Sequence, residues 1–192
     1  AFIFDMDGLL LDSERIVQRS WEIAGDELGI PHMEDVIYHT LGMNRAGRNE
    51  YFRKYIREDF PFEEFGKLTR DNFWKIVDKE GLPLKKGAKE LLAYGKSQGY
   101  KMAVATSSSR EYAMGNLIRA GIDSHFDSVV CGDMVKKAKP DPEIYQKACE
   151  SLGIQPEYCM AFEDAPGGIL SAHQAGMHVI MVPDLVQPTQ EI

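Results

Sequence analysis

Short apolar segments alternate with helical patterns over most of this chain, and this alternation limits the possible folds more than any other feature. One apolar segment, Ala1–Asp5, stands at the start of the sequence and has the pattern of a fully buried strand. Four later segments have the same character: Lys101–Ala105, Phe126–Cys131, Cys159–Phe162 and His178–Val182. Strands that alternate with helices build a parallel sheet with helices on both faces. The sequence therefore predicts an α/β fold.

The stretch from about Ser13 to Glu80 interrupts this alternation, because it contains helical patterns and turns only. Asp12 or Ser13 can cap the first expected helix. Further helices are expected over Met33–Leu41, Ala46–Ile56 and Phe62–Asp78. About seventy residues are too many for a loop inside a compact domain. We expect a three-layer, Rossmann-like parallel sheet core of residues 1–11 and 82–192. Residues 12–81 form an inserted α-helical cap domain in this prediction.

Two carboxylates stand one residue apart directly after the first strand, in the sequence Asp5-Met6-Asp7-Gly8. On an extended strand, residues i and i+2 point the same way, so Asp5 and Asp7 are expected to lie close together. Unpaired carboxylates at the end of a buried strand are costly. A divalent cation, or a reaction that needs a nucleophile beside an acid, would explain their presence.

Further polar residues follow the other predicted strands, and ligand sites in open α/β sheets lie at the carboxyl ends of the strands. They are Thr106–Ser109, Lys139 and the pair Glu163-Asp164. Each has an ordinary explanation when taken alone: a polar turn, a surface lysine or a helix cap. Together the acids suit Mg²⁺, and the lysine and hydroxyls suit a phosphate. A carboxylate beside such a phosphate can act as a nucleophile.

This order of motifs resembles the haloacid dehalogenase superfamily of phosphotransferases over the whole chain. The matching motifs are DMDG at Asp5–Gly8, Thr106 with Ser107, Lys139 in AKPDP, and Glu163-Asp164 in FEDAPGG. The helical insertion after the first motif is similar to the small cap of the subfamily that includes β-phosphoglucomutase and many sugar-phosphate phosphatases. A lone DxD motif would be a weak signal, whereas four motifs in order are specific.

The resemblance implies a role for each motif residue. Asp5 would attack phosphorus and form an aspartyl-phosphate, and Asp7 would protonate the leaving oxygen and later activate water. Thr106 would hydrogen-bond the phosphoryl group, with Ser107 and Ser108 beside it, and Lys139 would balance its charge. True dehalogenases lack the second aspartate, since a halide leaves without a proton. Asp7 therefore favours phosphoryl transfer.

The resemblance also implies a magnesium site. Its ligands would be Asp5, the backbone carbonyl of Asp7 and Asp164, with Glu163 binding directly or through water. In the cap, the loop Thr40–Arg45 matches the loop that reaches the substrate in this subfamily, and Gly42 and Arg45 are the expected contacts. A solvated arginine at the start of a helix explains Arg45 equally well.

One position departs from β-phosphoglucomutase, which has a histidine on the first cap helix that helps to shuttle a proton. Counted from DMDG, this position is Val17 here. We therefore expect a Mg²⁺-dependent phosphomonoester hydrolase that acts on a small phosphorylated metabolite, a sugar phosphate or nucleoside-like phosphate. A phosphomutase is the alternative, and a non-catalytic binding protein with the same fold is a distant one.

The composition limits the partners. A net charge of −8 argues against nucleic acid or an anionic membrane as the main partner. No signal peptide or apolar segment of membrane-spanning length is recognisable in the sequence. Cys131, Cys149 and Cys159 lie in apolar stretches and are expected to be buried, reduced thiols of a cytoplasmic protein. No sequence feature indicates an obligate interface, so we expect a monomer or a weak oligomer.

Overall fold

The computed structural model describes residues 1–40, 45–184 and 187–188. It divides into two compact units, one of Ala1–Asp12 with Leu82–Ile192 and the other of Ser13–Gly81. The first unit contains a parallel sheet and the second is helical, which confirms the predicted α/β class with a helical insertion. The first division between the units falls after Asp12, one residue later than the predicted boundary. That the two units are separate domains stays a prediction.

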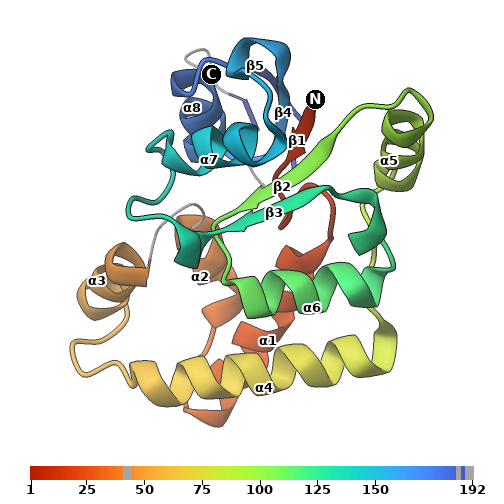
Figure 1. Cartoon of the computed structure of the whole chain (residues 1–192). Coiled ribbons are helices and arrows are strands. Elements are labelled where there is room, and N and C mark those ends of the chain that lie inside the picture. Colours follow the sequence, from red (N-terminus) through yellow and green to blue (C-terminus); the bar gives the residue numbers. More distant parts are fainter. Residues whose placement is uncertain (41–44, 185–186, 189–192) are drawn as a thin grey trace. The chain divides into compact units, whose positions relative to one another are not determined.

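A five-stranded, fully parallel sheet with the order β3-β2-β1-β4-β5 forms the centre of the first unit (Figure 1). The strands are β1 (Phe2–Phe4), β2 (Met102–Thr106), β3 (Ser128–Cys131), β4 (Met160–Glu163) and β5 (His178–Met181). All five lie within the apolar segments of the sequence or extend them by one residue. β1 lies in the middle, between β2 and β4. The strand order changes direction there, which is where ligands bind in open α/β sheets.

Helices cover both faces of this sheet, because successive strand residues point to opposite sides. Ile3 packs with residues of α7 (Glu143–Leu152) and α8 (Pro166–Gln174). Its neighbour Phe4 packs on the other side, with residues of α5 (Ala88–Ser97) and α6 (Arg110–Ala120). The unit also has three short 3-10 helices, η1 (Asp123–His125), η2 (Gly132–Met134) and η3 (Pro156–Tyr158). The predicted three-layer arrangement is thus present.

The second unit contains the helices α1 (Ser13–Glu27), α2 (Met33–Thr40), α3 (Arg45–Tyr55) and α4 (Phe62–Glu80). α1 packs against both α2 and α4. The apolar positions that recur at helical spacing form a separate core that is rich in aromatic rings. In this core the Trp21 ring meets the rings of Phe52 and Phe65 edge-on. The insertion therefore has its own core, as its length requires.

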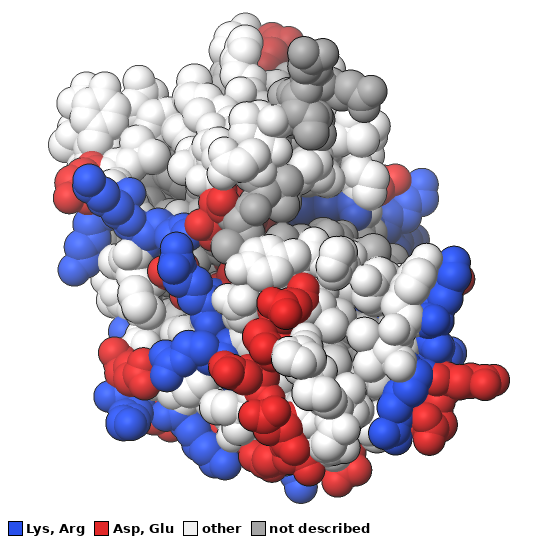
Figure 2. All heavy atoms as spheres, turned by 180° about the vertical axis from the view of Figure 1, so that it is seen from behind, with Lys and Arg blue, Asp and Glu red and all other residues white. Residues whose placement is uncertain are grey.

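The three cysteines are buried and free of disulfide bonds, as predicted. Within residues 1–40, 45–184 and 187–188, no helix has the length and apolar character needed to cross a membrane. Acidic and basic side chains are interspersed over the face of the molecule that Figure 2 shows. That nucleic acid is not a partner stays a prediction from the net charge of −8.

Candidate active site

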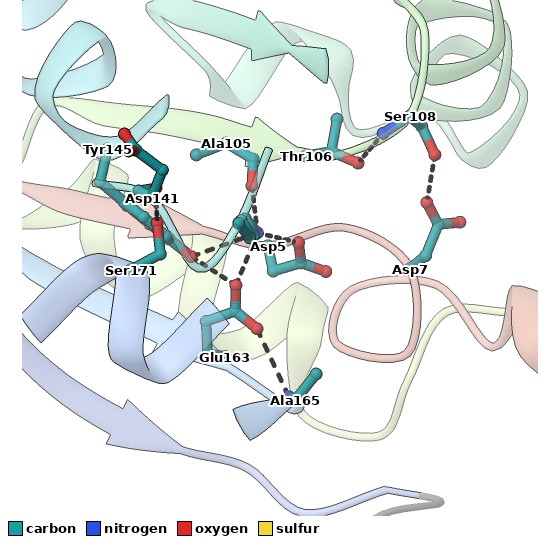
Figure 3. A network of polar contacts seen from close by, with 11 residues as sticks. Asp5, Asp7, Ala105, Thr106, Ser108, Asp141, Tyr145, Glu163, Ala165 and Ser171 are labelled. Atoms are coloured by element: carbon teal, nitrogen blue, oxygen red, sulfur yellow. Dashed lines mark hydrogen bonds and ion pairs between the residues drawn. The ribbon is translucent and has the colours of Figure 1, made fainter. Parts of the chain in front are cut away.

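Three adjacent strands deliver the predicted polar residues to one edge of the sheet. Asp5 follows β1, while Thr106 and Glu163 are the last residues of β2 and β4, which each begin and end one residue later than the sequence suggested. The pairing of β1 with both neighbours sets these three residues side by side. Figure 3 shows Asp5 between Glu163 and Asp7. Parallel pairing alone therefore assembles the centre of the predicted site.

Lys139 joins two of these carboxylates. Its Nζ lies 2.6 Å from Asp5 Oδ1 and 2.6 Å from Glu163 Oε1, and donates to the carbonyl of Ala105 at 2.9 Å. The side chains of Lys139 and Asp5 are only 10% and 11% exposed. Burial lowers the pKa of Lys139, but the carboxylates of Asp5 and Glu163 outweigh burial and raise it above its usual value. Lys139 is therefore a buried ammonium group and not a surface lysine.

Asp5 is buried beside more negative charge than Lys139 balances. Burial raises the pKa of Asp5 from 3.8 to about 7, and the Glu163 carboxylate adds to this rise while Lys139 opposes it. Few carboxyl groups in proteins have a pKa near neutral, and those that do are often found at functional sites. Additional positive charge near Asp5 would return it to the ionised form that a nucleophile needs.

Glu163 is held from several sides. Its Oε1 accepts hydrogen bonds from Lys139 Nζ and, at 2.6 Å, from the hydroxyl of Tyr145. The backbone N–H of Ala165 reaches Oε2 at 3.4 Å. Gly168 packs directly against the carboxylate, where a Cβ atom would overlap it. Burial, followed by the charge of Glu163, raises the pKa of Tyr145 well above its usual value, so its hydroxyl remains a donor.

The side chains of Asp5, Glu163 and Asp164 form a buried group of possible metal ligands, with ligand atoms within 4.8 Å of one another. Asp5 and Glu163 share the Lys139 ammonium group, and a divalent cation would balance the remaining charge of these two carboxylates. Carboxylate oxygens are the ligands that Mg²⁺ prefers. The residues present thus fit the predicted metal. The Asp7 carboxylate is not in this group, and the predicted role of its backbone carbonyl stays a prediction.

Asp7 lies at a turn beside the serines that follow β2. Its Oδ2 accepts a hydrogen bond of 2.8 Å from Ser108 Oγ, and the next residue, Gly8, has a φ of 85°, a conformation that favours glycine. Thr106 Oγ1 accepts the N–H of Ser108 at 3.1 Å, so the hydroxyls of Thr106 and Ser108 lie on one turn. Ser107 is exposed beside them. Ser108 is thus the residue of this loop that contacts Asp7.

Ser108 and Glu111 have the sequence spacing of a capping box, which would make Ser108 the cap of α6, but the structure has another cap. The cap of α6 is Ser109, whose hydroxyl accepts the N–H of Tyr112 at 3.4 Å. The hydroxyl of Ser108 is instead engaged by Asp7. The contact with Asp7 occupies the hydroxyl of Ser108, and the neighbouring Ser109 is the cap. Because Asp7 is far away in the sequence, the loop sequence alone does not predict this choice.

The predicted substrate contacts in the cap are described only in part. Gly42 lies outside the described residues, and of Arg45 only the backbone, as the first residue of α3, is described. Both assignments stay predictions. Two residues of the site were missed in the sequence, Tyr145 and Gly168. Tyr145 occupies an apolar position of a helix and Gly168 stands in a glycine pair, so neither differs visibly from an ordinary packing residue.

The strand-end carboxylates, the buried lysine and the helical insertion together define a haloacid dehalogenase-like hydrolase. The model of that family, described as "Haloacid dehalogenase-like hydrolase", matches residues 2–182, and the chain belongs to this family. The fold is that of the predicted β-phosphoglucomutase-like subfamily with a small helical cap. The predicted resemblance is thereby confirmed.

Several curated relatives of this chain are phosphatases by name. The chain is 34% identical to the phosphorylated carbohydrates phosphatase of Thermotoga maritima, over 94% of this chain and 83% of that protein. It is 33% identical to hexitol phosphatase A of Escherichia coli, over 95% and 82%. The structure of CbbY from Rhodobacter sphaeroides in complex with phosphate superposes with a TM-score of 0.79 at 26% identity, covering 95% and 85% of the two chains. The chain is accordingly a haloacid dehalogenase-like phosphatase.

Proposed function

We propose that this phosphatase is a Mg²⁺-dependent phosphomonoester hydrolase that works through a phosphorylated Asp5. The observation that carries this proposal is the buried cluster in which Lys139 lies 2.6 Å from both Asp5 and Glu163, at the end of the central strand. A metal bound at Asp5, Glu163, Asp164 and the backbone carbonyl of Asp7 would neutralise charge on the phosphoryl oxygens. Asp5 would then be an ionised, desolvated nucleophile.

The two aspartates divide the reaction in this proposal. A carboxylate oxygen of Asp5 attacks phosphorus, the ester P–O bond breaks, and the leaving oxygen takes its proton from Asp7. In the second half, Asp7 takes a proton from a water molecule whose oxygen attacks phosphorus, and the bond to Asp5 breaks to release inorganic phosphate. The hydrogen bond from Ser108 holds Asp7 on the loop side of Asp5, away from Lys139.

The remaining polar groups bind the phosphoryl group. Lys139 carries the positive charge nearest to Asp5, so it offsets the repulsion between the buried carboxylates and an incoming phosphate. The hydroxyls of Thr106, at the end of β2, and of Ser107, on the turn after it, are the proposed hydrogen-bond donors to the phosphoryl oxygens, and Ser108 lies beside them with its O–H donated to Asp7. A turn of this kind at the start of a helix is suited to an anion.

We propose a small phosphorylated metabolite as the substrate, a sugar phosphate before a nucleoside-like phosphate. The names of the relatives support this order, since one is a phosphatase of phosphorylated carbohydrates and one a hexitol phosphatase. In the cap, Gly42 and Arg45 are the proposed contacts for the part of the substrate beyond the phosphate. We favour hydrolysis over a mutase because Val17, packed against the aromatic core of the insertion, offers no group for proton transfer.

The test is the variant Asp5→Asn with p-nitrophenyl phosphate and a panel of sugar phosphates in the presence of Mg²⁺. We expect turnover to be abolished and the far-UV circular dichroism to match that of the unmodified protein. Asp78→Asn, at an exposed position of α4, is the matched control and should retain full activity. Retained turnover in Asp5→Asn would contradict the nucleophile assignment. Conversion of β-glucose 1-phosphate to the 6-phosphate without net phosphate release would show a mutase instead.

A further inference from the structure

Tyr145 is a core residue with one polar atom, and that atom faces the active site. The side chain lies on α7, is completely buried and packs with the residues that cover one face of the sheet. A phenylalanine could fill the same space, and a buried hydroxyl is costly unless it is hydrogen-bonded. The hydroxyl of Tyr145 donates to Glu163 Oε1 at 2.6 Å, which satisfies it. Figure 3 shows this contact from within the core.

The Glu163 carboxylate is held by two hydrogen-bond donors and by close packing against Gly168. Tyr145 and Lys139 both donate to the same oxygen, Oε1, each at 2.6 Å. The bare Cα of Gly168 lies against the carboxylate where any Cβ atom would collide with it. We call Lys139, Tyr145 and Gly168 the Glu163 socket. The socket holds the Glu163 carboxylate beside the carboxylates of Asp5 and Asp164.

We propose that Tyr145 is a positioning residue, which holds the Glu163 carboxylate in the orientation that a divalent cation at Asp5, Glu163 and Asp164 requires. Groups that orient metal ligands without touching the metal commonly change metal affinity by about 10-fold to 100-fold. Tyr145 also supplies Glu163 with a donor of its own, so Lys139 remains shared between Glu163 and Asp5 and does not turn to Glu163 alone. This role rests on the proposed Mg²⁺-dependent function of the site.

Two pairs of variants test the socket. Tyr145→Phe removes only the hydroxyl, and Tyr158→Phe makes the same change at a tyrosine that is 69% exposed. Gly168→Ala presses a methyl group against Glu163, whereas a Cβ atom at its neighbour Gly167 would have nothing within 4 Å. Gly167→Ala is therefore the matched control for the second pair. The two test variants act on Glu163 from different directions and do not depend on each other.

The measurement is the dissociation constant of Mg²⁺, taken by isothermal titration calorimetry on protein freed of metal with EDTA and dialysed. We expect Tyr145→Phe and Gly168→Ala to bind Mg²⁺ about 10-fold more weakly than the unmodified protein, and both controls to bind it equally well. The Mg²⁺ concentration for half-maximal hydrolysis should rise in parallel, with the rate largely restored at saturating Mg²⁺. Far-UV circular dichroism and the melting temperature in EDTA report whether each variant is folded.

A purely structural role for Tyr145 predicts another pattern, a lower melting temperature in EDTA with unchanged Mg²⁺ affinity, and this result would overturn the proposal. Unchanged Mg²⁺ affinity in Gly168→Ala would overturn it as well, should Tyr145→Phe fail to fold. Failure of the proposed function gives a different result, because the unmodified protein and both controls would then bind no Mg²⁺ and release no phosphate.

Discussion

Replacing Lys139 by methionine removes the only ammonium group that the described contacts place on Asp5 and Glu163. The substitution keeps the length of the side chain as far as Cε. Both carboxylates remain buried, and the side chain of Glu163 is only 1% exposed. Removing one partner of a buried ion pair destabilises a protein by about 3–5 kcal/mol, because the remaining charge is uncompensated. At about 2–4 °C per kcal/mol for a chain of this size, we expect the melting temperature to fall by about 6–20 °C.

The loss should depend on pH with a definite sign. The folded-state pKa of Asp5 is about 7, above its unfolded value of 3.8, so the folded protein binds this proton more tightly. Stability that depends on Asp5 therefore falls as the pH rises from about 4 to about 7. Without Lys139, whose charge lowers the pKa of Asp5, this range extends further upward. The destabilisation by Lys139→Met should consequently be large at about pH 8 and much smaller at about pH 5.

Thermal melts of metal-free protein at both pH values measure this difference. Lys137→Met is the matched control, since Lys137 is 73% exposed and its ammonium group pairs with Asp141 at the surface. Such exposed pairs contribute about 0.2–1 kcal/mol. Two results would refute the reasoning: equal losses for Lys139→Met at the two pH values, or a loss no larger than that of Lys137→Met.

Two further predictions concern the aspartates. Binding of Mg²⁺ at about pH 6.5 should release protons, because a cation lowers the raised pKa of Asp5, and calorimetry in two buffers of different ionisation enthalpy measures this release. Equal heats in both buffers would contradict it. Ser108→Ala should slow the hydrolysis of alkyl phosphates more than that of p-nitrophenyl phosphate, since Asp7 loses the donor that holds it and only a poor leaving group needs its proton. Ser97→Ala, which removes an exposed hydroxyl, is the control, and equal effects on the two substrates would argue against this role of Ser108.

The centre of the site could be predicted from the sequence because it depends on parallel strand pairing alone. Asp5, Thr106 and Glu163 belong to three strands that become neighbours once the fold is an open parallel sheet. Lys139 follows no strand directly; it was included because a lysine suits a phosphate, and its particular role came from the family resemblance. The structure brings it to Asp5 and Glu163. The order of the motifs was thus sufficient to predict which charged groups form the centre of the site.

The support around these groups could not be predicted in the same way. Tyr145 is recognisable as a core residue from its helical position, but its hydroxyl gains a purpose only when the fold brings it within 2.6 Å of Glu163, at the end of β4. Gly168 matters because of a single close approach to Glu163, and closeness of that kind depends on the packing of α8. The choice between Ser108 and Ser109 as the cap likewise depended on Asp7, which is far away in the sequence.

The central claim is that Asp5 carries the phosphoryl group, and trapping that group tests it most directly. Asp7→Asn removes the group proposed to activate water, so the phosphorylated form should outlast the first half of the reaction. The variant is mixed with Mg²⁺ and p-nitrophenyl phosphate, whose leaving group needs no proton from Asp7, then quenched in acid and digested, and its peptides are analysed by mass spectrometry. The account predicts one added phosphoryl group on the peptide that contains Asp5, and none in Asp5→Asn. Phosphate on another residue, or none in Asp7→Asn while a burst of leaving group is released, would contradict it.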